Sequence, residues 1–242
     1  MDLNGYKLVF EDDFNGNELD MNLWEYRGTG KRSCGYIAPE AVRVENGNMI
    51  MKYDYHNGEF GEGWYSGMIK LKQQFCKGYF ECRCICNDQI TRDGSGFWSA
   101  FWIQAGAPYT PSISKGGPGG AELDIIEGFL NYYTLRPAVE HNVHCAGYPD
   151  GSGEGMRSMG AKSIEVPTCY TEYHTYGLEW TDEVYRFYVD GECTLETAWA
   201  EGTSQVAEDV IFSLELPGVE PEDKDRSGEF IVDYVRIYQK ED

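Results

Sequence analysis

The chain has 242 residues, 41% hydrophobic and 14% aromatic, which is enough apolar material for a globular core. Its formal net charge of −21 repels nucleic-acid backbones and anionic membrane surfaces, so neither is expected as a partner. No run approaches the roughly 20 apolar residues of a membrane span. The first residues, MDLNGYKLVFEDDF, lack the basic start and apolar run of a signal peptide. We expect a soluble protein, cytoplasmic unless a leader once preceded these residues.

Short runs of alternating apolar and polar residues recur along the chain and predict β-strands. They are separated by Gly, Asn, Asp or Pro, and no long helical period interrupts them. In chain order they cover residues 41–55, 78–86, 96–104, 121–129, 139–145, 173–180, 184–196, 209–216 and 229–239. The pairs Asn46-Gly47 and Asp190-Gly191 each join two runs as a tight hairpin turn does, which predicts antiparallel pairing. We expect one all-β domain, residues 1–242, built as an antiparallel sandwich.

Eight cysteines do not show the paired spacing of a structural zinc site. Cys82, Cys84 and Cys86 alternate along one predicted strand, so their side chains point the same way in parallel. Disulfides within this row are not expected. We predict free, buried thiols, which suits a reducing or anaerobic setting.

The segment Ala121–Gly128, AELDIIEG, places three carboxylates among apolar residues. In an unbroken strand Glu122 and Asp124 share a face, but Glu127 points to the other. One β-bulge at Ile125-Ile126 would bring all three to the same face, and bulges are frequent beside active sites. The alternative is that these acids are salt-bridged or exposed on an edge strand.

Two neighbouring carboxyl groups are the catalytic groups that glycoside hydrolysis requires. A retaining enzyme needs two of them roughly 5–5.5 Å apart, one to attack and one to donate a proton. Asp124 adds a like charge between Glu122 and Glu127, so the set cannot ionise fully at neutral pH and one carboxyl keeps its proton. Trp98 and Trp102 share a face of the preceding strand, where they either stack on the apolar C–H faces of a sugar or pack in the core.

Five motifs occur in a fixed order: GFWSAFWIQ, AELDIIEGF, HNVHCAGY, YHTYGLEWTDEVYRFYVDG and FIVDYVRIY. Together they resemble glycoside hydrolase family 16, from about Leu8 to Tyr238. The resemblance implies a β-jelly roll of two curved antiparallel sheets, the concanavalin A-like lectin and glucanase fold. It also implies endo-acting, retaining hydrolysis of internal β-linkages in a polysaccharide.

The same resemblance implies roles for individual residues. The signature is similar to the bulged form of laminarinase-like and galactanase-like members, with Glu122 as nucleophile, Glu127 as acid/base and Asp124 tuning Glu122. Trp98 and Trp102 would line the glycone side of the cleft. His144 would reach the catalytic face together with Asn142.

Arg83 resembles the cleft-floor arginine of the family, although an ion pair with Glu81 explains it equally well. Many members carry one structural calcium, and Glu11, Gly47 and Asp233 match the positions that supply its oxygen ligands. No cofactor is expected for catalysis, and we expect a monomer.

The substrate stays open at this level. The leading hypothesis is a β-1,3- or mixed-linked glucan, and the alternative is a β-galactan such as an agar-like, porphyran-like or mucin-type chain. Ser213 and Glu215 stand in a strand where an amide residue is common in the family, which weakens a specific assignment. A transglycosylase and a non-catalytic carbohydrate-binding module are the remaining alternatives, and a binding module would have no need of Glu122 and Glu127.

Overall fold

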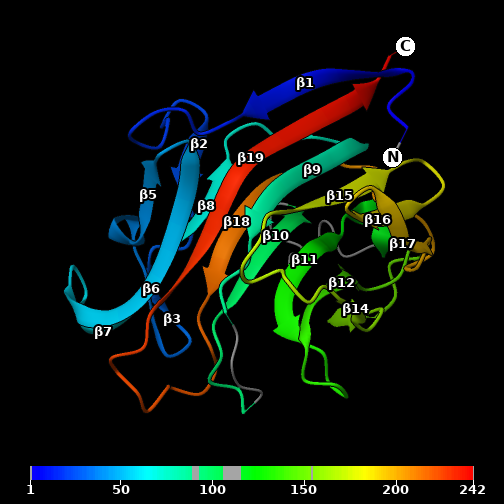
Figure 1. Ribbon diagram of the computed structural model, residues 1–242. Coiled ribbons are helices and arrows are strands. Elements are labelled where there is room, and N and C mark those ends of the chain that lie inside the picture. The colour runs from blue at the N-terminus through cyan, green and yellow to red at the C-terminus, as the bar shows by residue number, and fades with distance from the viewer. Residues whose placement is uncertain (1, 89–92, 106–115, 154, 242) are drawn as a thin grey trace.

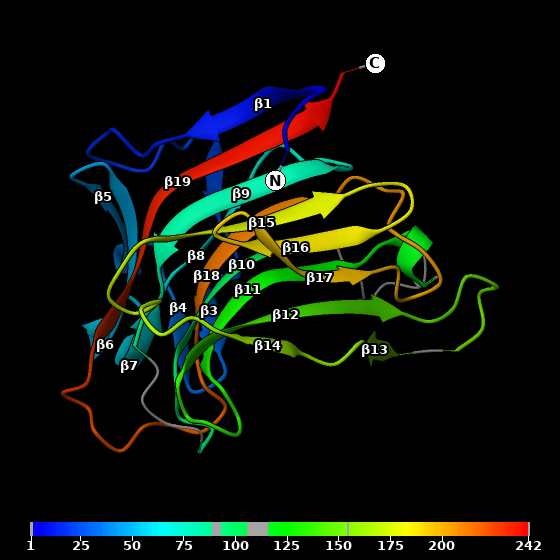
Figure 2. The ribbon, with the colours of Figure 1, turned by 45° about the vertical axis from the view of Figure 1, so that its right-hand side comes forward.

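The computed structural model describes residues 2–88, 93–105, 116–153 and 155–241. Within these ranges the chain is built of strands β1 to β19 and two short 3-10 helices, η1 (Pro39–Ala41) and η2 (Gly117–Gly119). The strands form two curved sheets that pack face to face (Figures 1 and 2). This arrangement confirms the predicted all-β sandwich.

The larger sheet has nine strands in one path, with β1 (Tyr6–Asp12) beside β19 and β5 (Val42–Glu45) beside β6. In spatial order the path is β17 (Glu192–Thr197), β16 (Tyr185–Val189), β15 (His174–Trp180), β9 (Gly78–Ile85), β19 (Gly228–Lys240), β6 (Asn48–Gly58), β7 (Gly61–Ser66), β4 (Gly35–Ile37) and β3 (Gly30–Arg32). Every described pair in this sheet is antiparallel except β4 with β7, which is parallel.

The smaller sheet carries the motifs that the sequence singled out. In spatial order its strands are β13 (Met156–Ser158), β12 (Pro137–Ala146), β11 (Glu122–Leu130), β10 (Trp98–Gln104), β18 (Asp209–Glu215), β8 (Met68–Leu71) and β2 (Trp24–Tyr26), with β14 (Lys162–Glu165) beside β12. The strand β18 is therefore adjacent to β10 in space although it is distant from it in sequence, and β11 lies on the other side of β10 (Figure 2).

Both predicted hairpins form with the expected turns. Glu45 pairs with Asn48 across Asn46-Gly47, and Val189 pairs with Glu192 across Asp190-Gly191. Asn46 and Gly47 have φ angles of 52° and 74°, and Asp190 and Gly191 have 49° and 79°. Two successive positive φ angles are the mark of the type I′ turn, whose twist matches that of the strands it joins.

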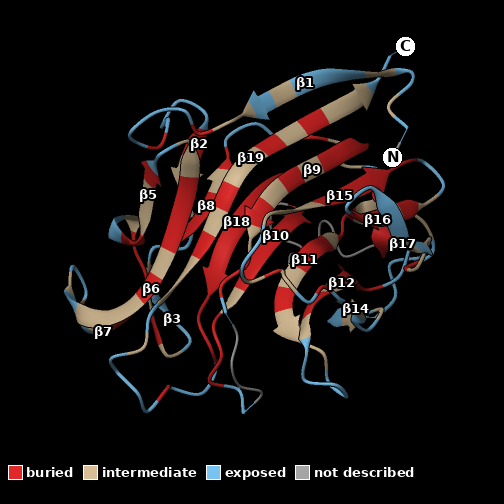
Figure 3. Ribbon diagram, viewed as in Figure 1, coloured by how far each residue is buried: buried red, intermediate tan, exposed pale blue. Residues whose placement is uncertain are grey.

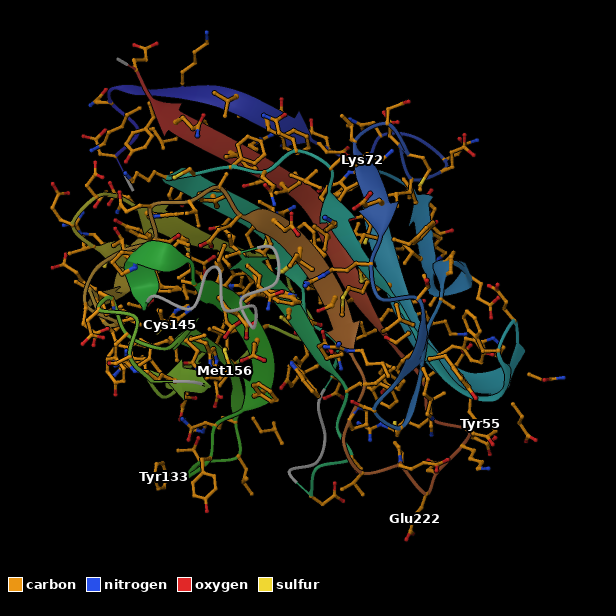
Figure 4. All side chains as sticks on the ribbon, turned by 180° about the vertical axis from the view of Figure 1, so that it is seen from behind. Tyr55, Lys72, Tyr133, Cys145, Met156 and Glu222 are labelled. Atoms are coloured by element: carbon orange, nitrogen blue, oxygen red, sulfur yellow. The ribbon has the colours of Figure 1, made fainter. Side chains whose placement is uncertain are left out.

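The hydrophobic core lies between the two sheets. Figure 3 shows its buried residues in red along the strands of both sheets. On β10 the alternate residues point into it, and Phe101 stacks on Phe212 of β18 at 4.6 Å between ring centroids. The other residues of β10 face the opposite side of the sheet. Large apolar side chains outside the core are few among the described residues; Tyr133, at the turn between β11 and β12, is 90% exposed and projects from the ribbon in Figure 4.

The cysteine row of β9 is also part of this core. All eight cysteines are free, and five of them are buried, namely Cys82, Cys84, Cys86, Cys145 and Cys169. The Sγ atoms of Cys82 and Cys84 lie 4.0 Å apart along the inner face of β9. The prediction of parallel, unbonded thiols is confirmed for this row.

Candidate active site

Strand β11 contains the bulge that the sequence predicted. Against β10, Asp124 pairs with Trp102 and Ile126 pairs with Phe101, so Ile125 has no partner on that side. Against β12, the register also shifts between Asp124 and Glu127. One extra residue therefore restores the alternation that the spacing of the acids breaks.

The three carboxylates consequently meet in one cleft of about 480 Å³ on the side of the smaller sheet away from the core. Alternate residues of β10 form its floor beside them, as the period of a strand requires. The residues that line the cleft are Arg27, Gly28, Arg32, Ser33, Met68, Trp98, Ala100, Trp102, Gln104, Glu122, Asp124, Glu127 and Glu215.

Each carboxylate has its own hydrogen-bond donor. Glu122 Oε2 accepts a bond from the side-chain amide of Gln104. Glu127 Oε1 accepts one from Trp98 Nε1 at 2.9 Å. Asp124 Oδ2 lies 3.1 Å from His144 Nε2. The three acids are therefore held in fixed orientations.

The environment of the cleft shifts the pKa values of the three acids. Burial and, after it, the neighbouring Asp124 charge raise the pKa of Glu122 to about 7, against the opposing effects of His144, Gln104 and Arg27. Burial also raises the pKa of Glu127 well above its usual range, and again the Asp124 charge adds to the shift. Burial raises the pKa of Asp124 too, against the effect of His144. Near neutral pH the site can thus hold an ionised carboxylate and a protonated one side by side.

The two tryptophans of β10 have different surroundings. Trp98 is partly exposed in the cleft, and its ring stacks on Phe129 with centroids 5.6 Å apart. Trp102 is only 9% exposed and donates a hydrogen bond to Ser213 Oγ at 3.0 Å. The guanidinium of Arg27 lies 4.8 Å from the ring centroid of Trp102. Trp98 therefore offers a surface to a ligand, whereas Trp102 serves mainly as a wall of the cleft.

The strand β12 places His144 opposite Glu122 and Asn142 opposite Asp124. The bond to Asp124 raises the pKa of His144 despite partial burial. Asn142 is 7% exposed, and its side-chain oxygen accepts bonds from Val143 N at 2.9 Å and Ser158 Oγ at 3.2 Å. His144 thus contacts Asp124 directly, and neither His144 nor Asn142 is among the residues that line the cleft.

The prediction that Arg83 lines the cleft is wrong. Arg83 belongs to β9 of the larger sheet, where Cys82 and Cys84 point into the core, so Arg83 points to the outer face. Its Nη1 lies 2.5 Å from Asp233 Oδ2. The alternative of an ion pair was right in kind, but the partner is Asp233 and not Glu81.

Two of the expected calcium ligands, Glu11 and Asp233, have carboxylates that pair with arginines. Glu11 Oε1 accepts a bond from Arg236 Nε at 2.7 Å, and Asp233 is paired with Arg83. Gly47 lies in the turn between β5 and β6.

Within the described residues, the one cluster of three metal-ligand side chains is Glu122, Asp124 and His144, whose donor atoms lie within 4.8 Å of one another. The bond between His144 and Asp124 explains this closeness without an ion.

Sequence reasoning missed four polar residues of the cleft: Arg27, Arg32, Ser33 and Gln104. Gln104 has a signal, since it follows Trp98 and Trp102 at even spacing on one strand. Arg32 reaches Glu215, with its Nη2 2.8 Å from Oε2, across more than 180 residues of sequence. No local sequence pattern predicts a contact between residues so far apart in the chain. The glycine-rich stretch 104–120 is of the kind that often carries binding contacts, but residues 106–115 lie outside the described residues.

The chain is similar to known proteins of one family. The family model of the beta-porphyranase A–D GH16 domain matches residues 8–240. A beta-glucanase of Rhodothermus marinus is 26% identical over 266 residues, which cover 97% of this chain and 85% of the relative. The keratan-sulfate endo-1,4-beta-galactosidase of Sphingobacterium multivorum is also 26% identical, over 97% of this chain and 55% of that relative. Apart from the Rhodothermus protein, the curated relatives are longer proteins, of which this chain spans 34% to 55%.

A solved structure from work on endo-acting O-glycanases of the human gut microbiota that initiate mucin breakdown has a TM-score of 0.78 to this chain. The two are 19% identical, and the match covers 98% of this chain and 92% of the other, which shows a shared fold.

Hydrolases of this family generally need no cofactor for catalysis. No helix in the described part of the chain is long and apolar enough to cross a membrane. The chain is a glycoside hydrolase with the jelly-roll fold, and the match over residues 8–240 shows that it belongs to glycoside hydrolase family 16.

Proposed function

We propose that the chain is a retaining endo-hydrolase of a β-linked polysaccharide, with Glu122 as nucleophile and Glu127 as acid/base. The observation that carries the proposal is the bulge in β11, which brings both buried carboxyl groups to one cleft. Burial raises the pKa of both carboxyl groups, that of Glu122 to about 7, so the site can pair an ionised carboxylate with a protonated acid near neutral pH.

The chemistry follows in two displacement steps. Glu122 attacks the anomeric carbon and forms a covalent glycosyl ester, while Glu127 gives its proton to the departing glycosidic oxygen. Glu127, now ionised, then takes a proton from water as the water oxygen attacks the same carbon. The ester bond breaks, Glu122 leaves as a carboxylate, and the anomeric configuration is retained.

Asp124 and His144 act on this cycle through charge. Because Asp124 raises the pKa of both glutamates, it helps Glu127 to keep its proton before the first step. The imidazole of His144 partly offsets that charge where it meets Asp124. We propose that Asp124 tunes the pair and that Trp98 lines the glycone side of the cleft.

The substrate that we propose is a β-galactan. The sequence alone favoured a β-glucan, but the matching family model is that of beta-porphyranases, and the Sphingobacterium relative is a keratan-sulfate endo-1,4-beta-galactosidase. A β-glucan remains the second candidate because of the Rhodothermus beta-glucanase, the relative most fully covered by this chain. Discrimination rests on hydrogen bonds to the 4-hydroxyl, which is axial in galactose and equatorial in glucose.

The test is product release from porphyran, agarose, keratan sulfate, mucin glycans, laminarin and lichenan. Glu122→Gln is expected to abolish release from every polymer, and Glu127→Gln to lower kcat by roughly 10²–10⁴-fold. The matched control is Glu220→Gln, because Glu220 is exposed and outside the cleft. Turnover that survives in Glu122→Gln would overturn the mechanism.

Two further readouts sharpen the result. Release from a galactan with silence on laminarin and lichenan supports the proposed substrate, and the reverse pattern supports the β-glucan. Proton NMR of the first product formed distinguishes retention from inversion at the anomeric carbon. An inverted first product would contradict the role of Glu122 as nucleophile.

We also propose that residues 1–242 form one catalytic domain that works as a monomer and carries a structural calcium near Glu11, Gly47 and Asp233. The ion would have to compete with Arg236 and Arg83 for the two carboxylates. Thermal unfolding with added Ca²⁺ or EDTA, together with the mass in solution, tests both points. An unchanged melting temperature in EDTA and Ca²⁺ would contradict the calcium site.

A further inference from the structure

The side-chain amide of Gln104 lies between a guanidinium and a carboxylate of the cleft. Gln104 is 4% exposed and is the direct cross-strand partner of Glu122. Its Oε1 accepts a hydrogen bond from Arg27 Nη2, and its Nε2 donates one to Glu122 Oε2. The result is a chain of two bonds that runs from Arg27 to Glu122.

Arg27 decides which way the amide points. A guanidinium carries donors only, so the amide oxygen must face it, and the NH₂ group must then face Glu122. A donor in that place favours the carboxylate form of Glu122 over the neutral acid. The orientation is therefore dictated by chemistry and not by the length of the side chain alone.

We propose that Gln104, oriented by Arg27, is a positioning residue for Glu122. Its N–H group holds Oε2, which leaves Oε1 of Glu122 free to attack, and it stabilises the ionised form that attack requires. This inference rests on the proposed role of Glu122 as nucleophile, and it adds a residue that the catalytic signature does not contain.

The other groups around Glu122 show why such a donor matters. Burial and the Asp124 charge oppose ionisation of Glu122, and the pKa of the group rises to about 7. His144, Gln104 and Arg27 act in the opposite direction, and Gln104 is the one of these three that touches the carboxylate with a neutral hydrogen bond. Loss of its N–H group should therefore move ionisation of Glu122 to higher pH.

The experiment is a carboxyl-carbon NMR titration of protein labelled with carbon-13 in its glutamate side chains. The Glu122 signal is assigned by its absence in Glu122→Gln, and no substrate is needed. In Gln104→Met, a replacement of similar length, we expect the midpoint of Glu122 to rise by about one unit, a ten-fold change in its ionisation equilibrium. Gln239→Met is the matched control, because Gln239 lies on β19 of the larger sheet and its amide donates to the backbone carbonyls of Cys76 and Lys77, outside the cleft.

Two more variants distinguish the contributions of the two hydrogen bonds that link Arg27, Gln104 and Glu122. Gln104→Glu keeps the bond to Arg27 but replaces the donor by an acceptor, so it should raise the midpoint more than Gln104→Met does. Arg27→Met removes both a charge and the orientation of the amide. The combination of Arg27→Met with Gln104→Met should raise the midpoint by less than the sum of the two single effects, because both act through one contact.

The possible outcomes distinguish this inference from the proposed function. An unchanged Glu122 midpoint in both Gln104→Met and Gln104→Glu would overturn the positioning role even if the enzyme cuts porphyran through Glu122. A raised midpoint in a protein that cuts none of the polymers would support the contact and count against the proposed function. Where porphyran is cut, Gln104→Met should lower kcat about ten-fold with little change in KM.

Discussion

At the scale of single residues, burial keeps acids of the cleft protonated at a higher pH than in water. It raises the pKa of Glu122 to about 7 and that of Glu127 well above its usual range. The same effect acts outside the cleft on Glu208, which is fully buried. Its Oε1 accepts a hydrogen bond from Ala121 N at 2.9 Å, the residue just before Glu122.

Glu208 should make stability fall as pH rises. Burial raises its pKa from 4.5 to about 8, so above pH 4.5 the unfolded chain ionises this group while the folded protein keeps it protonated. The stabilisation that is present below pH 4.5 is therefore lost progressively up to about pH 8. In Glu208→Gln that loss is absent, and the difference in unfolding free energy between the two proteins should change by a few kcal/mol from pH 5 to pH 8.

Urea unfolding at several pH values measures this difference, with Glu220→Gln as the exposed control. Parallel stability curves for Glu208→Gln and the wild type would contradict the prediction. A constant offset between them would reflect only the cost of burying an amide.

At the scale of elements, the bulge of β11 has to fit against the larger sheet. Gly128 follows Glu127 on this strand, and a Cβ atom there would lie 3.1 Å from Cys86 Cβ and 3.3 Å from Cys86 Sγ. The bulged strand can therefore lie this close to the residue after β9 only because Gly128 has no side chain.

Gly128→Ala should destabilise the protein by about 1–3 kcal/mol, because the added methyl group overpacks this contact. The matched control is Gly218→Ala, where a Cβ atom meets nothing within 4 Å. Denaturant unfolding of both variants is the measurement. Equal denaturant midpoints for Gly128→Ala and the wild type would contradict the prediction. They would show that the strands can move apart here at no cost in stability.

At the scale of the whole molecule, the core between the sheets shelters most of the thiols. Burial raises the pKa of Cys84 well above its usual range. The pKa of Cys86 is also raised, against the hydrogen bond with Cys169, by the hydrogen bond with Cys84 and by burial, so the reactive thiolate forms of both are suppressed. Cys193 is the one exposed cysteine of the eight.

A thiol reagent such as DTNB should therefore label the native protein quickly at Cys193 and reach all eight cysteines only in denaturant. Cys34 and Cys76, which are half-buried, should react slowly. The variant Cys193→Ser should lose the fast phase. Rapid labelling of the buried thiols in native protein would mean that the core opens readily.

The sequence by itself determined the two hairpins, the bulge and the strands that carry the catalytic residues, but it missed the strands β1 to β4, β7, β8, β13 and β14. The features that it determined follow from period-two alternation and from turn residues, which act between neighbours in the chain. The same local argument united Glu122, Asp124 and Glu127, since one extra residue is enough to correct their parity.

Only the tertiary structure decided which polar residues join them. Arg83 and Trp98 both lie on alternating strands, but sheet membership sends Arg83 to the outer face and Trp98 to the cleft. Arg27 reaches Gln104 through contacts between segments far apart in the chain. The physical reason is that alternation fixes which residues share a face, whereas long-range strand pairing fixes what that face meets.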